Sequence, residues 1–245
     1  MKSFHRMTIS EIKLFVREPM GMFFTLAFPL LLLFVFGSIF GNEPVALFGG
    51  MGTVDVSVPA YIGMTIATLG LLGLPIGLTT YREQGILRRL RATPVRPVVI
   101  FSALLAVNLL VALAGTLLLL VAGRLAFDLT MPAMPLSLLP AIFLCVLSFS
   151  ALGFVLAGLA STPRAAQAVG MALLMPMLFL SGAAMPRELI PENIQRIGDF
   201  LPLTYVVELL KGLWLGQGWD LAAVALLLGM LAVGTLLAMR TFRWE

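Results

Sequence analysis

Six long runs of apolar residues constrain the fold of this chain more than any other feature of its sequence. Each run lacks Asp, Glu, Lys, Arg and His, and each has about the 20 residues that a helix needs to cross the hydrocarbon core of a bilayer. Charged residues make up only 11% of the chain, whereas a soluble domain has about 25%. The sequence therefore predicts an all-α integral membrane protein with six transmembrane helices. The predicted spans cover residues 20–41, 58–80, 98–123, 136–160, 165–185 and 221–239.

The charged residues between these runs predict the orientation of the chain. Segments 1–19, 81–97, 161–164 and 240–245 would lie on one side, and they hold twelve of the sixteen Lys and Arg residues. Segments 42–57, 124–135 and 186–220 hold the other four, together with eight of the twelve Asp and Glu residues. Because cytoplasmic loops carry an excess of Lys and Arg, both termini are expected in the cytoplasm. The net charge of +4 is then explained by topology and by contacts with anionic lipids, and no nucleic-acid partner is expected.

Residues 1–19 are expected to form an amphipathic helix along the membrane surface, ahead of a six-span domain over residues 20–245. Apolar side chains occupy one arc of the helical wheel and basic side chains a narrow arc beside it, as in an interfacial helix. Pro19 ends this helix. An ordinary solvated N-terminal arm is the alternative. The apolar arc contains Phe4, Thr8, Ile9, Ile12, Phe15 and Val16, and the basic arc contains Lys2, Arg6, Lys13 and Arg17.

A short basic segment, residues 81–97, separates the second and third runs and holds five of the sixteen Lys and Arg residues. A helix is predicted over residues 82–93, because only Gly85 interrupts its helical sequence and Pro94 ends it. Three apolar residues share one arc of this helix, and Glu83 falls inside that arc, whereas the arginines lie outside it. A basic loop that only sets topology is the alternative. The apolar residues are Ile86, Leu87 and Leu90, and the arginines are Arg82, Arg88, Arg89 and Arg91.

The segment 186–220 is unusually long and apolar for a loop between two spans. A loop of this length inside a compact protein usually has structure of its own. We expect short helices over residues 192–200 and 204–215, which dip into the outer leaflet ahead of the last span. Trp214 and Trp219 fit an interfacial aromatic belt. A disordered external loop is the alternative, and the apolar residues of this segment disfavour it.

The sequence contains no recognisable catalytic or metal-binding constellation. His5 and Cys145 are the single residues of their kinds, which excludes a multi-histidine metal site and a Cys-based one. The absence of ionisable residues within the runs disfavours an ion-coupled or proton-coupled transporter. None of the three lysines, Lys2, Lys13 and Lys211, completes a G-x-x-x-x-G-K-[ST] loop. If the protein uses ATP, the ATPase must therefore be another chain.

Residues 83–94, with the sequence EQGILRRLRATP, resemble the signature of ATP-binding-cassette (ABC) type-2 permeases. These are the membrane subunits of bacterial exporters related to daunorubicin-resistance pumps, and their signature is approximately E-x-G-[TI]-L-x-R-L-x-[AS]-[TS]-P between the second and third spans. A second, less specific match is Pro186 followed by the segment LPLTY at residues 201–205. Lys211 is a departure, since such permeases often carry Arg there. The size and the six spans extend the resemblance over nearly the whole chain.

The resemblance implies that this chain works with separate subunits. Such permeases pair as dimers, here expected as a homodimer, and each copy binds an ABC ATPase subunit that carries ATP and Mg, so the chain itself would bind no cofactor. In this setting the helix of residues 82–93 is the coupling helix. Pro186, Pro202 and Tyr205 would belong to re-entrant helices at the external side. The expected contact with the ATPase consists of Glu83, Gly85, Ile86, Leu87, Arg88, Arg89, Leu90 and Arg91.

The predicted function is the permease subunit of an ATP-driven exporter in the bacterial inner membrane, with no enzymatic activity of its own. The expected cargo is an amphipathic drug, an antibiotic, a lipid or a polysaccharide. A self-contained carrier or channel without an ATPase is the alternative, and a neighbouring reading frame with a phosphate-binding loop would distinguish the two. A membrane-embedded lipid-modifying enzyme is a third class, which the missing intramembrane acids, histidines and metal ligands disfavour.

Overall fold

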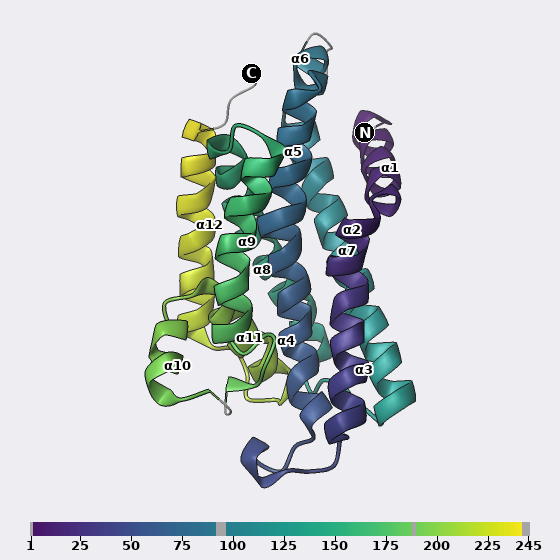
Figure 1. Ribbon diagram of the computed structural model, residues 1–245, viewed down its shortest axis with the longest axis vertical. Coiled ribbons are helices and arrows are strands. Elements are labelled where there is room, and N and C mark those ends of the chain that lie inside the picture. Colours follow the sequence, from purple (N-terminus) through teal and green to yellow (C-terminus); the bar gives the residue numbers. More distant parts are fainter. Residues whose placement is uncertain (1, 92–96, 188–189, 242–245) are drawn as a thin grey trace.

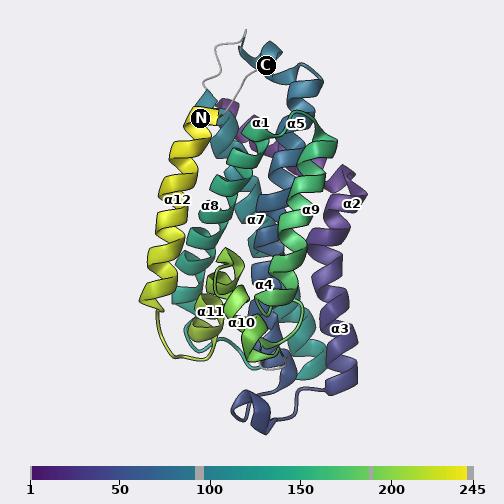
Figure 2. The ribbon, with the colours of Figure 1, turned by 60° about the vertical axis from the view of Figure 1, so that its left-hand side comes forward.

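The computed structural model describes residues 2–91, 97–187 and 190–241. All regular structure in these ranges is helical, apart from one bridge pair between Val45 and Met51. Six helical segments are long and apolar enough to cross a membrane, which confirms the predicted class. The segments stand side by side in an elongated bundle (Figures 1 and 2).

The six segments agree closely with the predicted spans. They run over Pro19–Phe40, Thr53–Glu83, Val98–Phe127, Pro135–Leu159, Pro163–Leu180 and Leu221–Thr241. The first contains α2 (Pro19–Met22), the π-helix η1 (Phe23–Ala27) and α3 (Phe28–Phe40). The second contains α4 (Thr53–Thr68), the π-helix η3 (Leu69–Gly73) and α5 (Leu74–Glu83). The others are α7 (Pro97–Phe127), α8 (Pro135–Leu159), α9 (Pro163–Leu180) and α12 (Leu221–Thr241).

The remaining helices lie outside these segments. The first is α1 (Lys2–Arg17), and a 3-10 turn, η2 (Ala46–Phe48), lies between the first two spans. The others are α6 (Ile86–Arg91), α10 (Glu192–Gly198) and α11 (Pro202–Trp214).

Two span boundaries differ from the prediction in an informative way. The second span begins at Thr53, before the predicted start at residue 58, so Asp55 lies in the first turn of α4 and not in a loop. The fifth span ends at Leu180, before the predicted end at residue 185. It ends there because Gly182 has a φ of +86°, a left-handed conformation that terminates a helix and favours glycine.

The second span forms the centre of the bundle. Every residue of α4 is buried, and α4 contacts α3, α7, α8, α9 and α11. A helix that is apolar on all sides is expected to be surrounded by other helices. By contrast, the buried residues of α12 are only Ala223, Leu227 and Gly234, so α12 lies at the periphery of the chain.

Pro29 and Pro75 explain the two π-helices. A proline lacks an N–H and its ring clashes with the carbonyl four residues earlier, which here belongs to Thr25 and to Leu71. The wide turns η1 and η3 lie directly before these prolines and accommodate the ring. The carbonyl of Thr25 accepts a hydrogen bond at 3.3 Å from Thr65 Oγ1, whose single proton is shared with the carbonyl of Tyr61 at 3.1 Å. A neighbouring helix therefore contributes a donor to the first of these carbonyls, as expected for prolines within spans.

The carbonyl of Leu71 points to α9 instead. A Cβ atom placed on Gly170 would overlap this oxygen, and one on Gly153 of α8 would overlap the carbonyl oxygen of Gly70. Only glycine permits both approaches. The π-helix η3 is therefore the place where the second span packs most closely against α8 and α9.

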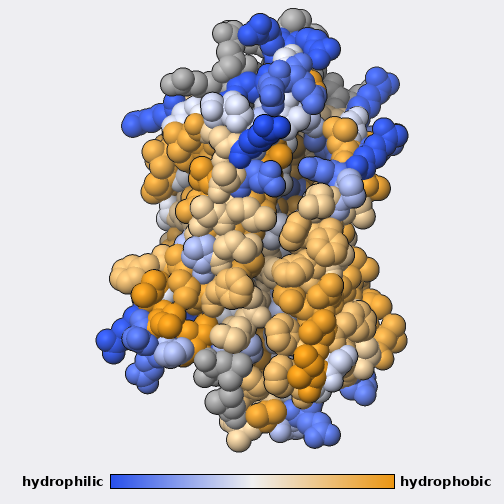
Figure 3. All heavy atoms as spheres, in the orientation of Figure 1, coloured by the Kyte–Doolittle hydropathy of each residue, from blue (hydrophilic) through white to orange (hydrophobic). Residues whose placement is uncertain are grey.

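The two ends of the bundle differ in structure. The end that carries α6 also carries the start of α1 and the end of α12 (Figure 1), and hydrophilic side chains gather there (Figure 3). The opposite end holds α10 and α11, and one face of α11 is fully buried against the bundle. Trp214 is only 2% exposed, so its predicted place in an outer aromatic belt is wrong because it packs into the core. Trp219 is 39% exposed.

Candidate functional site

The sequence signature lies at a joint between α5 and α6. The predicted helix over residues 82–93 is divided, because α5 ends at Glu83 and α6 begins at Ile86. Gly85 adopts a φ of +67°, and its N–H donates to the carbonyl of Arg82 at 3.0 Å. This is the conformation of a glycine that terminates a helix. Residues 92 and 93 lie outside the described residues.

The break separates side chains that were expected to share one face. Glu83 is exposed, as are Arg88 and Arg89, whereas Leu87 is only 1% exposed. Ile86 is partly buried. The side chains of Leu90 and Arg91 lie outside the described part of the chain. The surface of the joint is therefore polar, and Leu87 packs inside the protein.

Arg82 connects this joint to the end of α8. Its Nη1 atom donates to the carbonyl of Ala157 at 3.2 Å, and its Nη2 atom donates to the carbonyl of Ala160. The last carbonyls of a helix have no partner within the helix, and a cation at this end interacts favourably with the helix dipole. Arg82 was predicted only to lie outside the apolar arc. The sequence feature that could have indicated this contact is the position of Arg82 in the last turn of a span.

A cavity of about 500 Å³ lies between the joint and the ends of two other spans. Arg82 and Glu83 form one side of it, and the connection between α8 and α9 forms another. Arg240 and Thr241 contribute from α12. Glu83 therefore faces a concave surface to which α5, α8 and α12 all contribute.

The N-terminal helix is attached immediately before the joint. The hydroxyl of Tyr81 donates to both carboxylate oxygens of Glu11 at 2.8 Å. Burial is the larger influence on Glu11 and raises the pKa of its carboxyl above the usual value, while the hydrogen bond from Tyr81 acts in the opposite direction. The sequence did not predict this contact. A carboxylate is not expected on the buried side of an amphipathic helix, because that side normally carries apolar residues.

The rest of α1 follows the predicted pattern in part. It packs along α7, with Thr8 buried and Ile12 and Phe15 partly buried, whereas Phe4, Ile9 and Val16 of the predicted apolar arc are more exposed. The side chain of Lys2 lies outside the described residues. The other predicted basic residues, Arg6, Lys13 and Arg17, are exposed.

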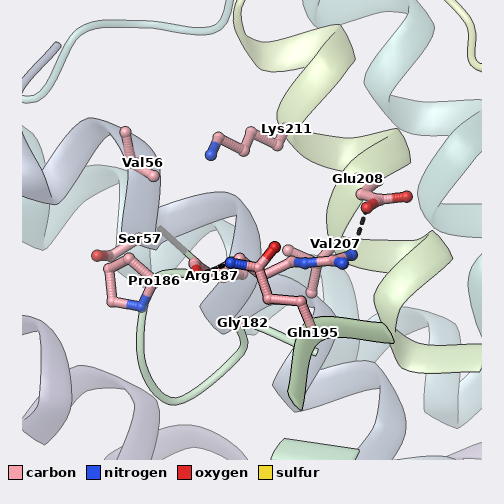
Figure 4. A pocket seen from close by; sticks show the side chains of 10 residues that line it. Val56, Ser57, Gly182, Pro186, Arg187, Gln195, Val207, Glu208 and Lys211 are labelled. Atoms are coloured by element: carbon pink, nitrogen blue, oxygen red, sulfur yellow. Dashed lines mark hydrogen bonds and ion pairs between the residues drawn. The ribbon is translucent and has the colours of Figure 1, made fainter. Parts of the chain in front are cut away.

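The predicted external residues fall at the opposite end. Pro202 starts α11, and the hydroxyl of Tyr205 donates to the carbonyl of Asp199 at 2.8 Å, which connects α11 to α10. Pro186 lines a second cavity of about 410 Å³ (Figure 4). The structure therefore brings Pro186 to a cavity and gives Pro202 and Tyr205 roles in shaping the two short helices.

An arginine next to Pro186 organises this second cavity. Arg187 pairs with Asp199 and with Glu208 of α11, each at 2.5 Å. Burial raises the pKa of the Glu208 carboxyl, and the nearby Arg187 acts in the opposite direction. Gly182 permits this arrangement, because a Cβ atom there would lie 2.8 Å from the Cγ atom of Arg187.

Asp55 forms a polar network that was not predicted. Its carboxylate accepts hydrogen bonds from Asn42 Nδ2 at 3.2 Å and from the N–H of Thr130 at 2.8 Å. Asn42 Oδ1 in turn accepts the N–H groups of Val54 and Asp55, at 3.1 Å each, and so caps α4. The network joins the ends of α3, α4 and α7. An acidic residue three positions after Gly52 was the signal for a helix start here.

Comparison with known proteins identifies the family. The family described as ABC-2 type transporter matches residues 2–215. Nodulation protein J of Rhizobium leguminosarum bv. viciae is 37% identical over 95 residues, which is 39% of this chain and 36% of that protein. Nodulation protein J of Bradyrhizobium diazoefficiens is 35% identical over 86 residues, which is 35% of this chain and 33% of that protein.

A third relative is similar over a longer range. The ycf38 protein of Porphyra purpurea, which carries the name of a transport permease, is 26% identical over 240 residues, which is 92% of this chain and 79% of that protein. The match to the nodulation proteins covers only about a third of their length. Since the family match includes both the joint at Gly85 and most of the spans, this multi-pass membrane protein belongs to the ABC-2 type transporter family.

Proposed function

We propose that this chain is the transmembrane permease subunit of an ATP-driven exporter in the inner membrane of a bacterium. Membership of the ABC-2 type transporter family supports a separate ATPase subunit, which would hold ATP and Mg. The proposed cargo is an amphipathic molecule, such as a drug, an antibiotic, a lipid or a polysaccharide. Export of such molecules would give the cell efflux and antibiotic resistance.

One observation carries the proposal, namely that the joint at Gly85 is attached to three other parts of the chain. Arg82 binds the end of α8, Tyr81 binds α1, and α5 is the last part of the second span, in which every residue of α4 is buried. A displacement of α6 would therefore reach the centre of the bundle, α8 and α1 together. This is the property that an element needs if it is to transmit the work of an ATPase to a transport pathway.

The exposed side chains of the joint define the surface for the ATPase. Glu83, Arg88 and Arg89 would face the partner, with the two arginines forming ion pairs with its acidic residues. Because Leu87 is buried, it would anchor α6 to its own chain and would not contact the partner directly. The partner would also contact the cavity beside Glu83.

The outer surface of the spans supports contacts with lipids and with a second copy of the chain. Few residues of the first span and of α12 are buried within the chain. They are Thr25, Pro29, Leu33 and Gly37 in the first span, and Ala223, Leu227 and Gly234 in α12. Such helices need lipid or another protein around them. We propose a homodimer, with lipids covering the rest of this surface and the exposed basic residues of α1 lying on the cytoplasmic membrane face.

Co-expression with an ATPase encoded beside this gene tests the proposal. We expect the two proteins to co-purify, and vesicles that contain both to move a fluorescent amphiphile only with ATP. Glu83→Ala should leave insertion intact and abolish the stimulated ATPase activity and the transport. Glu43→Ala changes an exposed glutamate at the opposite end and serves as the matched control.

Two outcomes would contradict the proposal. Normal transport by Glu83→Ala would exclude the joint as the place where energy enters. Transport by the purified chain alone, without an ATPase, would favour the self-contained carrier instead.

A further inference from the structure

The cavity beside Arg187 has a lining that suits a particular kind of ligand. It lies between the start of α4, the segment at Pro186, α10 and α11 (Figure 4). Its volume of about 410 Å³ is within the range of sites that hold small molecules. Val56, Ala60 and Val207 form an apolar part of the wall. The polar part of the wall determines the specificity.

Two neutral polar residues of this wall have used their donors elsewhere. Ser57 donates its hydroxyl proton to the carbonyl of Thr53 at 2.7 Å. Gln195 Nε2 donates to the carbonyls of Arg187 at 2.9 Å and of Ile190 at 2.7 Å. A hydroxyl has a single proton and an amide has two. With these hydrogen bonds in place, Ser57 and Gln195 present acceptor oxygens to a ligand, and the amide oxygen of Gln195 points away from the carbonyls that its nitrogen binds.

The charged residues of the wall are close to balanced. Glu208 uses Oε1 for its bond to Arg187, which leaves Oε2 as a further acceptor. Lys211 lies one turn later on the same helix and extends into the cavity (Figure 4). Asp199 also pairs with Arg187, so the charges of Arg187, Lys211, Glu208 and Asp199 cancel. The cavity therefore combines several acceptor oxygens with cationic donors.

This combination points to a ligand group that both donates and accepts hydrogen bonds. An anion would meet three acceptor oxygens, on Ser57, Gln195 and Glu208, and a cation would meet the positively charged side chains of Arg187 and Lys211. A hydroxyl group is both donor and acceptor, so several hydroxyls can satisfy both sets of partners without a charge of their own. The apolar part of the wall provides a surface for the adjoining hydrocarbon.

We propose that this cavity binds an uncharged, hydroxyl-rich group, such as the sugar headgroup of an amphiphile, as the cargo leaves the protein. The proposal rests on the transport function proposed above and narrows its cargo. Ser57, Gln195 and Glu208 accept hydrogen bonds from the hydroxyls, and Lys211 donates to one of their oxygens.

Photo-labelling with three amphiphiles that share one tail tests the proposal. Octyl glucoside, octyl phosphate and octyltrimethylammonium, each with a diazirine in the tail, would be added separately to the full-length protein in lipid nanodiscs. Mass spectrometry would then locate the adducts. We expect the glucoside to label the start of α4 and α11 at lower concentration than the other two probes, and excess unmodified octyl glucoside to compete.

Ser57→Ala and Lys211→Met identify the contributing groups. Each substitution should raise the glucoside concentration needed for labelling about fivefold. This is the factor by which the loss of one hydrogen bond, with its net contribution of about 1 kcal/mol, changes a binding constant. Thr235→Val is the matched control for Ser57→Ala. Thr235 also donates its hydroxyl within a helix, to the carbonyl of Leu231 at 2.7 Å, but it lies on α12 and does not line the cavity.

The outcomes are distinct. Equal labelling by all three probes, stronger labelling by the phosphate, or no effect of Ser57→Ala and Lys211→Met would overturn the proposed site. Because labelling needs no ATPase, it can fail while the ATPase still co-purifies and drives transport, in which case only the headgroup site is wrong. If the ATPase does not co-purify and no ATP-dependent transport is found, but the glucoside still labels the cavity selectively, the proposed exporter function is wrong. The proposed headgroup site would still stand in that case.

Discussion

The hydroxyl of Tyr81 binds both carboxylate oxygens of Glu11, at 2.8 Å each, across 70 residues of sequence. Tyr81 lies in the last turns of α5, two residues before Glu83, and Glu11 lies on the buried side of α1. The position of α1 and the position of the joint at Gly85 are therefore linked by one hydrogen-bonded pair. Since Glu11 is only 9% exposed, its carboxylate depends on this donor.

Tyr81→Phe tests the link, because it keeps the ring and removes only the hydroxyl. A buried polar group that loses its partner costs about 1–3 kcal/mol, so we expect a lower Tm and faster hydrogen exchange in α1. Tyr205→Phe is the control, since it removes a hydroxyl bond at the opposite end and should leave exchange in α1 unchanged. Unaltered exchange in α1 of Tyr81→Phe would show that the pair does not hold this helix.

The same pair predicts a pH dependence of stability. Burial raises the pKa of the Glu11 carboxyl above its usual value of 4.5, so the folded state holds the proton more tightly than the unfolded state. The stabilisation from this proton is complete below pH 4.5 and is lost as the pH rises through the raised pKa.

Glu11→Gln should therefore be more stable than the original protein at neutral pH. Gln is always neutral and its amide oxygen can still accept the hydroxyl of Tyr81. We expect the difference in Tm to be largest at neutral pH and to shrink as the pH approaches 4.5. A difference that does not change between these conditions would contradict burial as the cause.

Arg82→Met tests the connection between the joint and α8. The variant keeps an apolar stem but leaves the carbonyls of Ala157 and Ala160 without their donor. We expect a loss of about 1–3 kcal/mol, faster hydrogen exchange around residue 160, and weaker coupling of ATP hydrolysis to transport. Arg164→Met removes an exposed arginine at the same end and should change the exchange rates little. Equal effects of the two variants would indicate a general role of charge at this surface.

The length and hydropathy of the apolar runs were sufficient to predict the six spans. Each run is uncharged over the thickness of a bilayer, and helices are the way in which a single segment satisfies its own backbone there. The apolar residues of segment 186–220 likewise indicated α10 and α11. These features depend on local sequence, which is why they could be recognised without knowledge of neighbouring helices.

The contacts that define the candidate site could not be recognised in this way. Glu11 and Tyr81, and Arg82 and Ala157, are 70 and 75 residues apart, and they meet only because of the rotation and tilt of their helices. The hydropathy of a span determines neither its rotation about its axis nor its tilt. At Gly85 the sequence on both sides favours a helix, and the glycine itself, with its φ of +67°, was the local signal for the division. The burial of Leu87 depends on its neighbours in space and could not be recognised from the local sequence.

A close approach between α9 and the second span gives the last prediction. A Cβ atom on Gly170 would overlap the carbonyl oxygen of Leu71, whereas a Cβ atom on Gly77 would have nothing within 4 Å. Gly170→Ala should therefore push α9 away from η3 and destabilise the protein by about 1–3 kcal/mol. Gly77→Ala, in α5, should be neutral or stabilising by about 0.5–1 kcal/mol, because Ala is favoured over Gly in a helix.

Thermal unfolding of both variants in one detergent measures this difference. The opposite signs matter, because a general effect of replacing glycine in a span would shift Tm in the same direction for both. Pro75 cannot donate to the carbonyl of Leu71, and this carbonyl lies in the wide turn at η3, so the contact with Gly170 is made at that turn. If Gly170→Ala is as stable as Gly77→Ala, the close packing of α9 against the second span is not needed for stability.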